Sequence, residues 1–314
     1  MTGDLLTALQ AADSDEAREW IVIQFSLAGL ESPIREAVWI AAIPHWFDQH
    51  WLAAVLDQSL EETRPIFERL ITLSYIELFP ERGYNVHERT RRLLLTHLWQ
   101  DHPDRYRELT RRAMTYAERQ DQTDVAWRIE TIYHRLVAEP DSGGSHLVNT
   151  GWEWHNPPNF AYDKVEMLAR AAREHADAGR LIPRSLGWTL FWEGLLDLDY
   201  QRFSSAKSKF LQIQTSAQLD PSLAADRAFR LGSVHQVLDE YEAARQRFDE
   251  ALAIYRSIGD RLGEANCLRS LGQIHQSLNE YEAARQRFDE ALAIYRSIGD
   301  RLGEANCLRW LANI

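Results

Sequence analysis

The sequence predicts a mainly α-helical protein, with a stack of helix pairs in its C-terminal part and a small β-hairpin nearer its N-terminus. Three observations support this fold class. The 29-residue stretch from Tyr241 to Arg269 returns unchanged from Tyr281 to Arg309, at a spacing of 40. Apolar residues within each copy recur at helical intervals. Upstream, the segment LSYIELFPERGYNVHE alternates in the manner of two strands joined by a turn.

Charge and cysteine content exclude several classes of function. The net charge of -12 argues against a chain that wraps nucleic acid, because such a chain needs a basic surface. No run of about 18 apolar residues and no signal peptide occur, so we expect no membrane span and a cytoplasmic location. Cys267 and Cys307 hold equivalent places in the two copies, roughly 10 Å apart. That separation is too long for a disulfide, so we expect two buried thiols.

The front of the chain reads as a helical segment over residues 1–30 followed by three short helices. Ile34–Ala42 is apolar after Ser-Pro, Asp48 can cap a helix that runs through Leu56, and Leu60–Leu73 forms the third. Two strands follow, with Gly83 in the positive-φ position of their turn, and then the helix RTRRLLLTHLW. Three helices and a hairpin predict a winged-helix-like domain over residues 31–100.

Residues 101–185 are predicted to form a helical spacer. Its most unusual stretch is GWEWHNPPNF, from Gly151 to Phe160. Two interpretations stay open for it. It is either a connection packed against the preceding helix, or a ligand loop, because tryptophan offers flat apolar area with a hydrogen-bond donor.

Residues 186–314 contain the repeats. In the second copy Leu268, Leu271 and His275 mark one face of a first helix, and Leu278–Glu280 forms a break. A second helix follows, with its apolar face formed by Tyr281, Ala284, Phe288, Ala291, Leu292 and Tyr295. Gly299 can close that helix in a left-handed conformation, and Asp300 can cap the next one. Each unit is therefore a pair of antiparallel helices.

These pairs resemble the tetratricopeptide repeat in its extended 40-residue form. The pattern of that family is matched by Leu271-Gly272, His275, Ala284, Phe288 and Ala291, and again by Leu231-Gly232, His235, Ala244, Phe248 and Ala251. An earlier pair aligns through Gly194, Ala206 and Phe210 but departs from the pattern at Glu193 and Asp197. The resemblance implies a superhelical solenoid of about three pairs plus a terminal half-repeat.

The last half-repeat leaves Trp310, Leu311 and Ile314 without a following helix. A solenoid end needs a polar cap, so we expect this apolar end either to continue into further repeats or to take part in self-association. Of the two, continuation of the array is our hypothesis.

A second resemblance concerns the segment LITLSYIELFPERGYNVHERTRRLLLTHLW, from Leu70 to Trp99. It is similar to the winged-helix part of the signal transduction ATPases with numerous domains (STAND proteins of the NB-ARC or NACHT type). In that family a Met-His-Asp motif contacts the β-phosphate of the nucleotide. Val86-His87-Glu88 occupies the matching place, which implies a nucleotide contact for His87 in a larger parent. The alternative is a hydrogen-bonded histidine at a strand end.

No catalytic or metal site is predicted. A phosphate loop needs a lysine after glycines, and none of the three lysines, Lys164, Lys207 and Lys209, follows a glycine. We therefore expect no ATP hydrolysis by this polypeptide alone and no cofactor. The histidine pairs His45/His50 and His97/His102 are five residues apart, off the spacing that places two ligands on one helical face. No Gly-x-Ser-x-Gly motif occurs.

The tetratricopeptide resemblance implies a binding surface on the first helices. Its inward-facing positions fall on Phe229, Ser233, Gln236, Val237, Asn266, Arg269, Gln273, Gln276, Ser277, Asn306, Arg309 and Asn313. Amides and a repeated arginine suit an extended and acidic peptide, because arginine presents a fork of donors to a carboxylate. The alternative is an ordinary solvated surface.

The sequence thus predicts a non-enzymatic protein-interaction or sensor module, the regulatory portion of a signalling or defence STAND protein. One alternative is a DNA-binding regulator that uses the winged helix, although the acids of Leu60–Leu73 make that helix a poor reader of a DNA groove. Another is a partner that acts in trans on a separate NTPase core.

Overall fold

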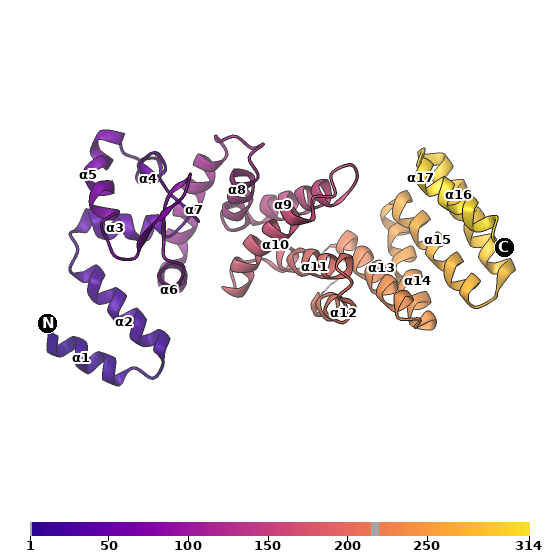
Figure 1. The fold of residues 1–314 in the computed structure, drawn as a ribbon, viewed down its shortest axis with the longest axis horizontal. Helices are drawn as coiled ribbons and strands as arrows, with labels where there is room; N and C mark the ends of the chain where they lie inside the picture. Colours follow the sequence, from indigo (N-terminus) through magenta and orange to yellow (C-terminus); the bar gives the residue numbers. More distant parts are fainter. Residues whose placement is uncertain (1, 215–219) are drawn as a thin grey trace. The chain divides into compact units, whose positions relative to one another are not determined.

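The computed structural model describes residues 2–214 and 220–314. These residues form seventeen α-helices and one two-stranded sheet (Figure 1), which confirms the mainly helical fold class. In the same ranges, no helix is both long and apolar enough to cross a lipid bilayer. The chain divides into two compact units, residues 1–146 and residues 147–314. The predicted boundaries at 30 and 100 fall inside the first unit, and the boundary at 185 falls inside the second.

The first unit opens with five helices whose starts are set by local capping: α1 (Thr2–Ala11), α2 (Asp15–Ala28), α3 (Ser32–Ala41), α4 (Gln49–Leu56) and α5 (Leu60–Leu70). The Asp48 carboxylate accepts a hydrogen bond from the Trp51 N–H at 2.7 Å, as predicted. Ser59 and Glu62 form a capping box at the start of α5. Helix α5 ends three residues earlier than predicted, because the chain turns from Ile71 onward.

The predicted hairpin is present as β1 (Ile76–Phe79) and β2 (Gly83–Val86), antiparallel with Ile76 opposite Val86. Gly83 has a φ of 107°, and a Cβ there would lie 2.5 Å from the Phe47 carbonyl oxygen. Phe47 and Tyr84 exchange backbone hydrogen bonds of 2.7 and 2.9 Å, which attach the hairpin to the α3–α4 connection. The elements occur in the predicted order, and the winged-helix assignment itself stays a prediction.

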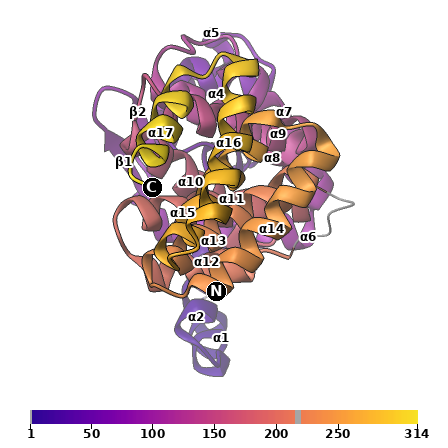
Figure 2. The ribbon, with the colours of Figure 1, turned by 90° about the vertical axis from the view of Figure 1, so that its right-hand side faces the viewer.

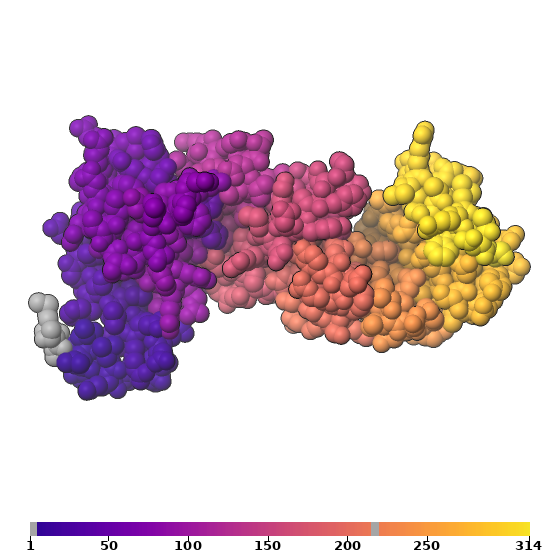
Figure 3. All heavy atoms as spheres, viewed as in Figure 1, coloured from indigo at the N-terminus to yellow at the C-terminus, as the bar shows by residue number. Residues whose placement is uncertain are grey.

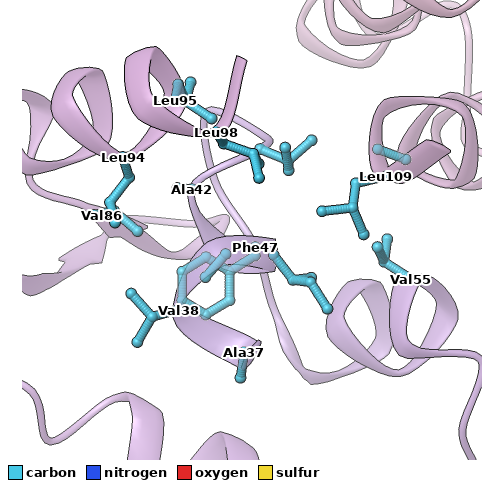
Figure 4. Close-up of a cluster of buried hydrophobic side chains, with 14 of the residues drawn as sticks. Ala37, Val38, Ala42, Phe47, Val55, Val86, Leu94, Leu95, Leu98 and Leu109 are labelled. Atoms are coloured by element: carbon cyan, nitrogen blue, oxygen red, sulfur yellow. The ribbon is translucent and has the colours of Figure 1, made fainter. Parts of the chain in front are cut away.

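The first unit is completed by α6 (Glu88–Asp101), α7 (Pro103–Ala117) and α8 (Val125–Ala138). Its core gathers side chains from α3, α4, α6, α7 and β2. Figure 4 shows Val38, Phe47, Val55, Leu98 and Leu109 converging there, and all five are at most 5% exposed. Because these residues lie up to 71 positions apart in sequence, from Val38 to Leu109, the apolar core fixes how the helices and the hairpin pack together.

The interpretation of the tryptophan-rich stretch as a connection holds for its second half and is wrong for its first. Residues 156–160 form a connection, in which Asn159 Nδ2 donates to the Glu153 carbonyl of the preceding helix at 2.7 Å. Residues Gly151 to His155 belong to that helix, α9 (Pro140–His155). Its glycines allow close packing of helices. A Cβ on Gly143 would lie 2.6 Å from the Leu136 backbone, and one on Gly151 would lie 2.2 Å from the Trp192 ring.

The second unit contains consecutive antiparallel helices: α10 (Tyr162–Asp177), α11 (Pro183–Asp199), α12 (Phe203–Gln212), α13 (Pro221–Val237), α14 (Tyr241–Ile258), α15 (Arg261–Ser277), α16 (Tyr281–Ile298) and α17 (Arg301–Leu311). Helices α13–α14 and α15–α16 form pairs, and α17 packs against α16 (Figures 1 and 2). The break at Leu278–Glu280, the left-handed Gly299 and the cap at Asp300 are all confirmed. In Figure 3 the atoms of α14 to α17, in orange and yellow, lie in close contact.

Candidate partner-binding surface

Each helix pair is held together by a glycine on its first helix that faces a phenylalanine on its second. A Cβ on the glycine would lie 2.7 to 2.8 Å from the ring, so only glycine fits. The three glycine–phenylalanine pairs are Gly194–Phe210, Gly232–Phe248 and Gly272–Phe288. The pair α11–α12, whose sequence departs from the repeat pattern, therefore packs in the same way as the two later pairs.

In each pair the two residues that flank the turn form a backbone hydrogen bond and an acid–base side-chain contact. Either of the two can be the acidic residue. In α15–α16 the Glu280 N–H donates to the His275 carbonyl at 2.8 Å, and His275 Nδ1 lies 2.5 Å from the Glu280 carboxylate. In α11–α12 the Arg202 N–H donates to the Asp197 carbonyl at 2.7 Å, and the two side chains form an ion pair at 3.3 Å. In α11–α12 the acidic residue therefore precedes the turn and the basic residue follows it, whereas in α15–α16 the basic His275 precedes the turn and the acidic Glu280 follows it.

The other departure, Glu193, is explained by its neighbours. Its carboxylate accepts from Arg173 at 2.6 and 2.5 Å and from Lys209 at 2.6 Å. Burial alone would raise the pKa of Glu193, but these cationic donors hold it below its ordinary value. A charged side chain is thus accommodated where the later pairs have leucine.

The predicted binding positions fall into three rows that run across the first helices α13 and α15, and the first two rows continue to α17 or to the residues just after it. We call them together the first-helix surface. Its first row is Phe229, Arg269 and Arg309; its second is Ser233, Gln273 and Asn313; and its third is Gln236 and Gln276. Within the rows, equivalent residues are 40 apart. Of these side chains, those of Arg309 and Asn313 are exposed and the others are half-buried. Val237 and Ser277, at the ends of their helices, are exposed.

The rows are connected physically across neighbouring repeats. Gln236 Nε2 donates to Gln273 Oε1 at 3.3 Å, which joins α13 to α15. The equivalent pair one repeat later is Gln276 of α15 and Asn313, which lies two residues beyond the end of α17. Helices α15 and α17 are in contact. Amide groups therefore follow one another along the first helices.

Two of the predicted site residues hold the repeats together. Asn266 Oδ1 accepts a hydrogen bond from the Tyr295 hydroxyl at 2.8 Å, which fastens α15 to α16. Phe229 packs on Phe248 with ring centroids 5.5 Å apart. Asn306 is half-buried. Sequence reasoning missed the tyrosine contact, although the signal was present in the 29-residue spacing from asparagine to tyrosine.

The pair α13–α14 has aspartate where the next pair has Asn266. The Tyr255 hydroxyl donates to Asp226 Oδ1 at 2.5 Å. Burial raises the pKa of Asp226 to about 6, against the lowering effect of Tyr255 and Arg230, and the charges of Asp260 and Asp220 add to the increase. Near neutral pH this carboxylate is therefore ionised at an energetic cost.

The arginines of the first-helix surface have no carboxylate partner among the described residues. Arg269 lies near Cys307: burial raises the pKa of that thiol to about 11, and the guanidinium acts in the opposite direction. The Arg309 guanidinium lies 5.6 Å from the centroid of the Trp310 ring. Both guanidinium groups can therefore bind an external anion without first breaking an ion pair within the protein.

The first-helix surface ends at α13. In α11 the equivalent positions are Phe191, Leu195 and Leu198, all apolar. Phe191 is fully buried, and the Trp152 ring of α9 packs on it with centroids 5.7 Å apart. The tryptophan-rich stretch thus covers the start of the stack and leaves three first helices for a partner.

At the apolar end predicted for α17, Trp310, Leu311 and Ile314 are half-buried and pack against the core of the repeats. Leu308 is 44% exposed, whereas its equivalent Leu268 is 1% exposed because α16 covers it. The Trp310 ring stacks on the Phe288 ring of α16 with a centroid separation of 6.2 Å.

His87 lies at the N-terminal cap of α6, with an exposed side chain. Its backbone N–H donates to the Tyr75 carbonyl at 2.8 Å, and its carbonyl accepts from Arg91 at 2.9 Å. The imidazole is accessible to an external group.

The most buried charged cluster of the first unit was not predicted. Glu130 is 1% exposed, and its carboxylate lies 2.6 Å from His45 Nδ1 and 3.1 Å from His134 Nε2. Arg91 donates to the Pro44 carbonyl at 2.9 Å and to the Tyr133 hydroxyl at 3.0 Å beside it. The cluster fastens α8 to the α3–α4 connection and α6. Across residues 2–214 and 220–314, no group of three or more His, Cys, Asp or Glu side chains could hold a metal ion.

The cysteines are free and buried, as predicted. Burial raises the pKa of the Cys267 thiol well above its ordinary value. At neutral pH both thiols are protonated, and the protonated form is a poor nucleophile.

Comparison with known proteins bears on the repeats. Residues 223–297 match the family model of the tetratricopeptide repeat. No curated protein matches the chain. Similar solved structures include BtubC (BKLC) from P. vanneervenii, with 16% identity, a TM-score of 0.43, and coverage of 65% of this chain and 90% of that one.

Two further solved structures are similar at low identity. A STAND protein with a tetratricopeptide repeat sensor from Pyrococcus horikoshii has 14% identity and a TM-score of 0.44, with 98% of this chain covered and 51% of that one. Aspartyl phosphate phosphatase F from Bacillus subtilis has 16% identity and a TM-score of 0.42, with 90% and 79% covered. This chain thus spans about half the length of the STAND protein.

Repeats of this family are a non-catalytic fold that generally binds protein partners. The glycine–phenylalanine contacts and the helix-pair turns extend the same packing back to α11. Residues 223–297 thus match the tetratricopeptide repeat, and the glycine–phenylalanine contacts between α13 and α14 and between α15 and α16 agree with that match.

Proposed function

We propose that the second unit is a protein-interaction module whose first-helix surface binds an extended, acidic segment of a partner protein. One observation supports this most directly. Arg269 and Arg309 are equivalent residues on neighbouring first helices, neither has a carboxylate partner in the described chain, and amides flank both. A guanidinium that is already near its final position loses less freedom when it binds a carboxylate.

We also propose that the chain serves as the regulatory portion of a signalling or defence STAND protein. The support is the order of elements: three helices, a hairpin, a further helix, a helical spacer and then tetratricopeptide repeats. In such a larger assembly the exposed His87 is available to a nucleotide phosphate. Reconstitution with a separate ATPase core would test this, since His87→Ala should weaken retention of ADP by the complex.

The wing-mediated DNA-binding alternative gains no support from the arginines of residues 82–112. Arg89 and Arg92 pair with Glu19 and Glu16 of α2, and Arg105 pairs with Glu36. Because carboxylates neutralise these groups within the first unit, few cations remain for a phosphate backbone.

Charge reversal at the two surface arginines tests the proposed binding. We expect Arg269→Glu with Arg309→Glu to abolish capture of the partner from a lysate of the source cell, followed by mass spectrometry, at an unchanged melting temperature. Arg245→Glu with Arg285→Glu is the matched control, because these arginines are also 40 apart but lie on the second helices α14 and α16. Equal capture by both double variants and the wild type would refute the proposal.

A further inference from the structure

A cleft of about 290 Å³ lies in the first unit, between the β1–β2 turn, the α3–α4 connection and α8. Its volume is close to the lower end of the roughly 300–1,000 Å³ that is usual for small-molecule sites. The residues that line it include three tryptophans and three charged side chains: Trp46, Asp48, Trp51, Glu81, Arg82 and Trp127. Aromatic rings and charges that meet in one cleft are typical of a ligand site.

Two of the tryptophan rings form an aromatic corner. The Trp46 and Trp127 ring centroids are 5.3 Å apart, and the ring planes meet at 65°. One of these rings already holds a cation, because the Arg82 guanidinium carbon lies 5.2 Å from the centroid of the Trp46 ring. The negative face of an aromatic ring attracts a cation within about 6 Å of its centroid. The corner is therefore suited to a positively charged group.

The charges around the cleft also favour a cation. Asp48 and Glu81 line it, and neither forms an ion pair within residues 2–214 and 220–314. The Arg82 guanidinium is neutralised by Asp124, at 2.7 Å. Three carboxylates and one guanidinium leave a charge of about -2 at the cleft, so an external cation is attracted to it.

The third tryptophan provides an unused donor. Trp51 lines the cleft and is 1% exposed, and its indole N–H has no acceptor in the part of the chain that the structure describes. A buried donor without an acceptor is unfavourable. A ligand that brings an oxygen to this N–H therefore gains affinity by supplying the acceptor.

The supply of acceptors discriminates between kinds of cation. A primary ammonium group has three N–H donors, and each of them needs an acceptor when water is excluded. Here Glu81 is exposed, and one oxygen of Asp48 already accepts from the Trp51 backbone N–H at 2.7 Å. A quaternary ammonium group has no N–H donor and is held by ring faces and by charge. The cleft therefore suits the quaternary ion better.

We propose that this cleft binds a small quaternary ammonium compound that carries an oxygen near its charged end. The ammonium group lies in the corner of Trp46 and Trp127, Asp48 and Glu81 balance its charge, and the oxygen accepts from the Trp51 indole N–H. This site lies in the first unit, and it is independent of the protein binding proposed for the second unit.

Isothermal titration calorimetry of the whole chain with choline tests the proposal. The matched probes are 3,3-dimethyl-1-butanol, which has the shape of choline without its charge, and tetramethylammonium, which has the charge without the oxygen. We expect choline to bind at least about tenfold more tightly than the neutral alcohol. We also expect it to bind several times more tightly than tetramethylammonium, because only choline offers an acceptor to Trp51.

Variants of the two carboxylates locate the binding. Asp48→Asn with Glu81→Gln should weaken choline binding at least about tenfold. Asparagine is as good a helix cap as aspartate, so α4 should keep its start. The matched control is Asp57→Asn with Glu77→Gln, which removes two exposed carboxylates at the other end of α4 and on β1. This control should bind choline as the wild type does.

Each contrary outcome would overturn a stated part of the proposal. Undetectable binding of choline at millimolar concentration, or equal affinity for choline and the neutral alcohol, would overturn the cation site. An equal loss of affinity in the two double variants would show that the cleft is not where choline binds. Tighter binding of tetramethylammonium, or of a peptide that carries trimethyllysine, would overturn the role of the ligand oxygen.

Discussion

The exchange of aspartate for asparagine between equivalent repeats offers a sharp test of the packing. Asp226 and Asn266 each accept a hydrogen bond from a tyrosine of the second helix, at 2.5 and 2.8 Å. Only Asp226 can ionise. Asp226→Asn keeps an acceptor for Tyr255 and removes the charge, so it converts this site into the one already present in the next repeat.

The expected gain follows from the pKa. Burial raises the pKa of Asp226 from 3.8 to about 6. A carboxyl group whose pKa is raised in the folded state favours folding below the unfolded pKa, and that contribution is lost as the pH rises through about 6. A difference of about two pKa units corresponds to about 3 kcal/mol of unfolding free energy at pH values above both pKa values. Asp226→Asn should therefore stabilise the protein by up to that amount near neutral pH and by little in acid.

Urea unfolding followed by circular dichroism measures this, at about pH 4.5 and about pH 7.5. The free-energy difference between Asp226→Asn and the wild type should grow with pH. The reciprocal change, Asn266→Asp, should introduce a loss of stability at the higher pH. A difference that does not depend on pH, or a variant less stable than the wild type near pH 7.5, would refute the reasoning.

Two further predictions concern residues that the repeats use structurally. Gly272→Val should lower the unfolding free energy by about 1–3 kcal/mol, because the valine side chain would overlap the Phe288 ring. The control Ala312→Val, at the exposed equivalent position, should change the unfolding free energy by less than about 0.5 kcal/mol. Equal effects of the two variants in thermal melts would contradict this packing. Glu193→Gln should destabilise the protein by about 1–3 kcal/mol near neutral pH but not in acid. A carboxylate whose pKa is lowered in the folded state contributes stability above its unfolded pKa of 4.5, and that contribution is lost as the pH falls. A loss of stability that persists in acid would show that the ion pair with Arg173 does not cause it.

Much of the repeat architecture could be predicted because its signals are local and occur twice. The break at Leu278–Glu280, the left-handed Gly299 and the cap at Asp300 follow from turn and capping chemistry within a few residues. The hairpin around Gly83 was readable for the same reason. The positions of the first-helix surface were also predictable, since a duplicated sequence places equivalent residues on equivalent helices.

The remaining features depend on contacts between distant residues. The glycines of α9 disfavour a helix locally, yet Gly143 and Gly151 are required where other helices approach their backbone. Glu130 meets His45 across 85 residues of sequence, which no local pattern indicates. The role of Asn266 as the acceptor for Tyr295 was likewise hidden, because an asparagine on an inward-facing position also suits a ligand contact.

The central claim is that each helix pair of the second unit is stabilised by its immediate neighbours only. Hydrogen–deuterium exchange with mass spectrometry on Gly272→Val tests it most directly. We expect faster exchange in α15 and α16, a smaller change in α14 and α17, and no change in α11 and α12. A uniform loss of protection over residues 147–314 would contradict the claim.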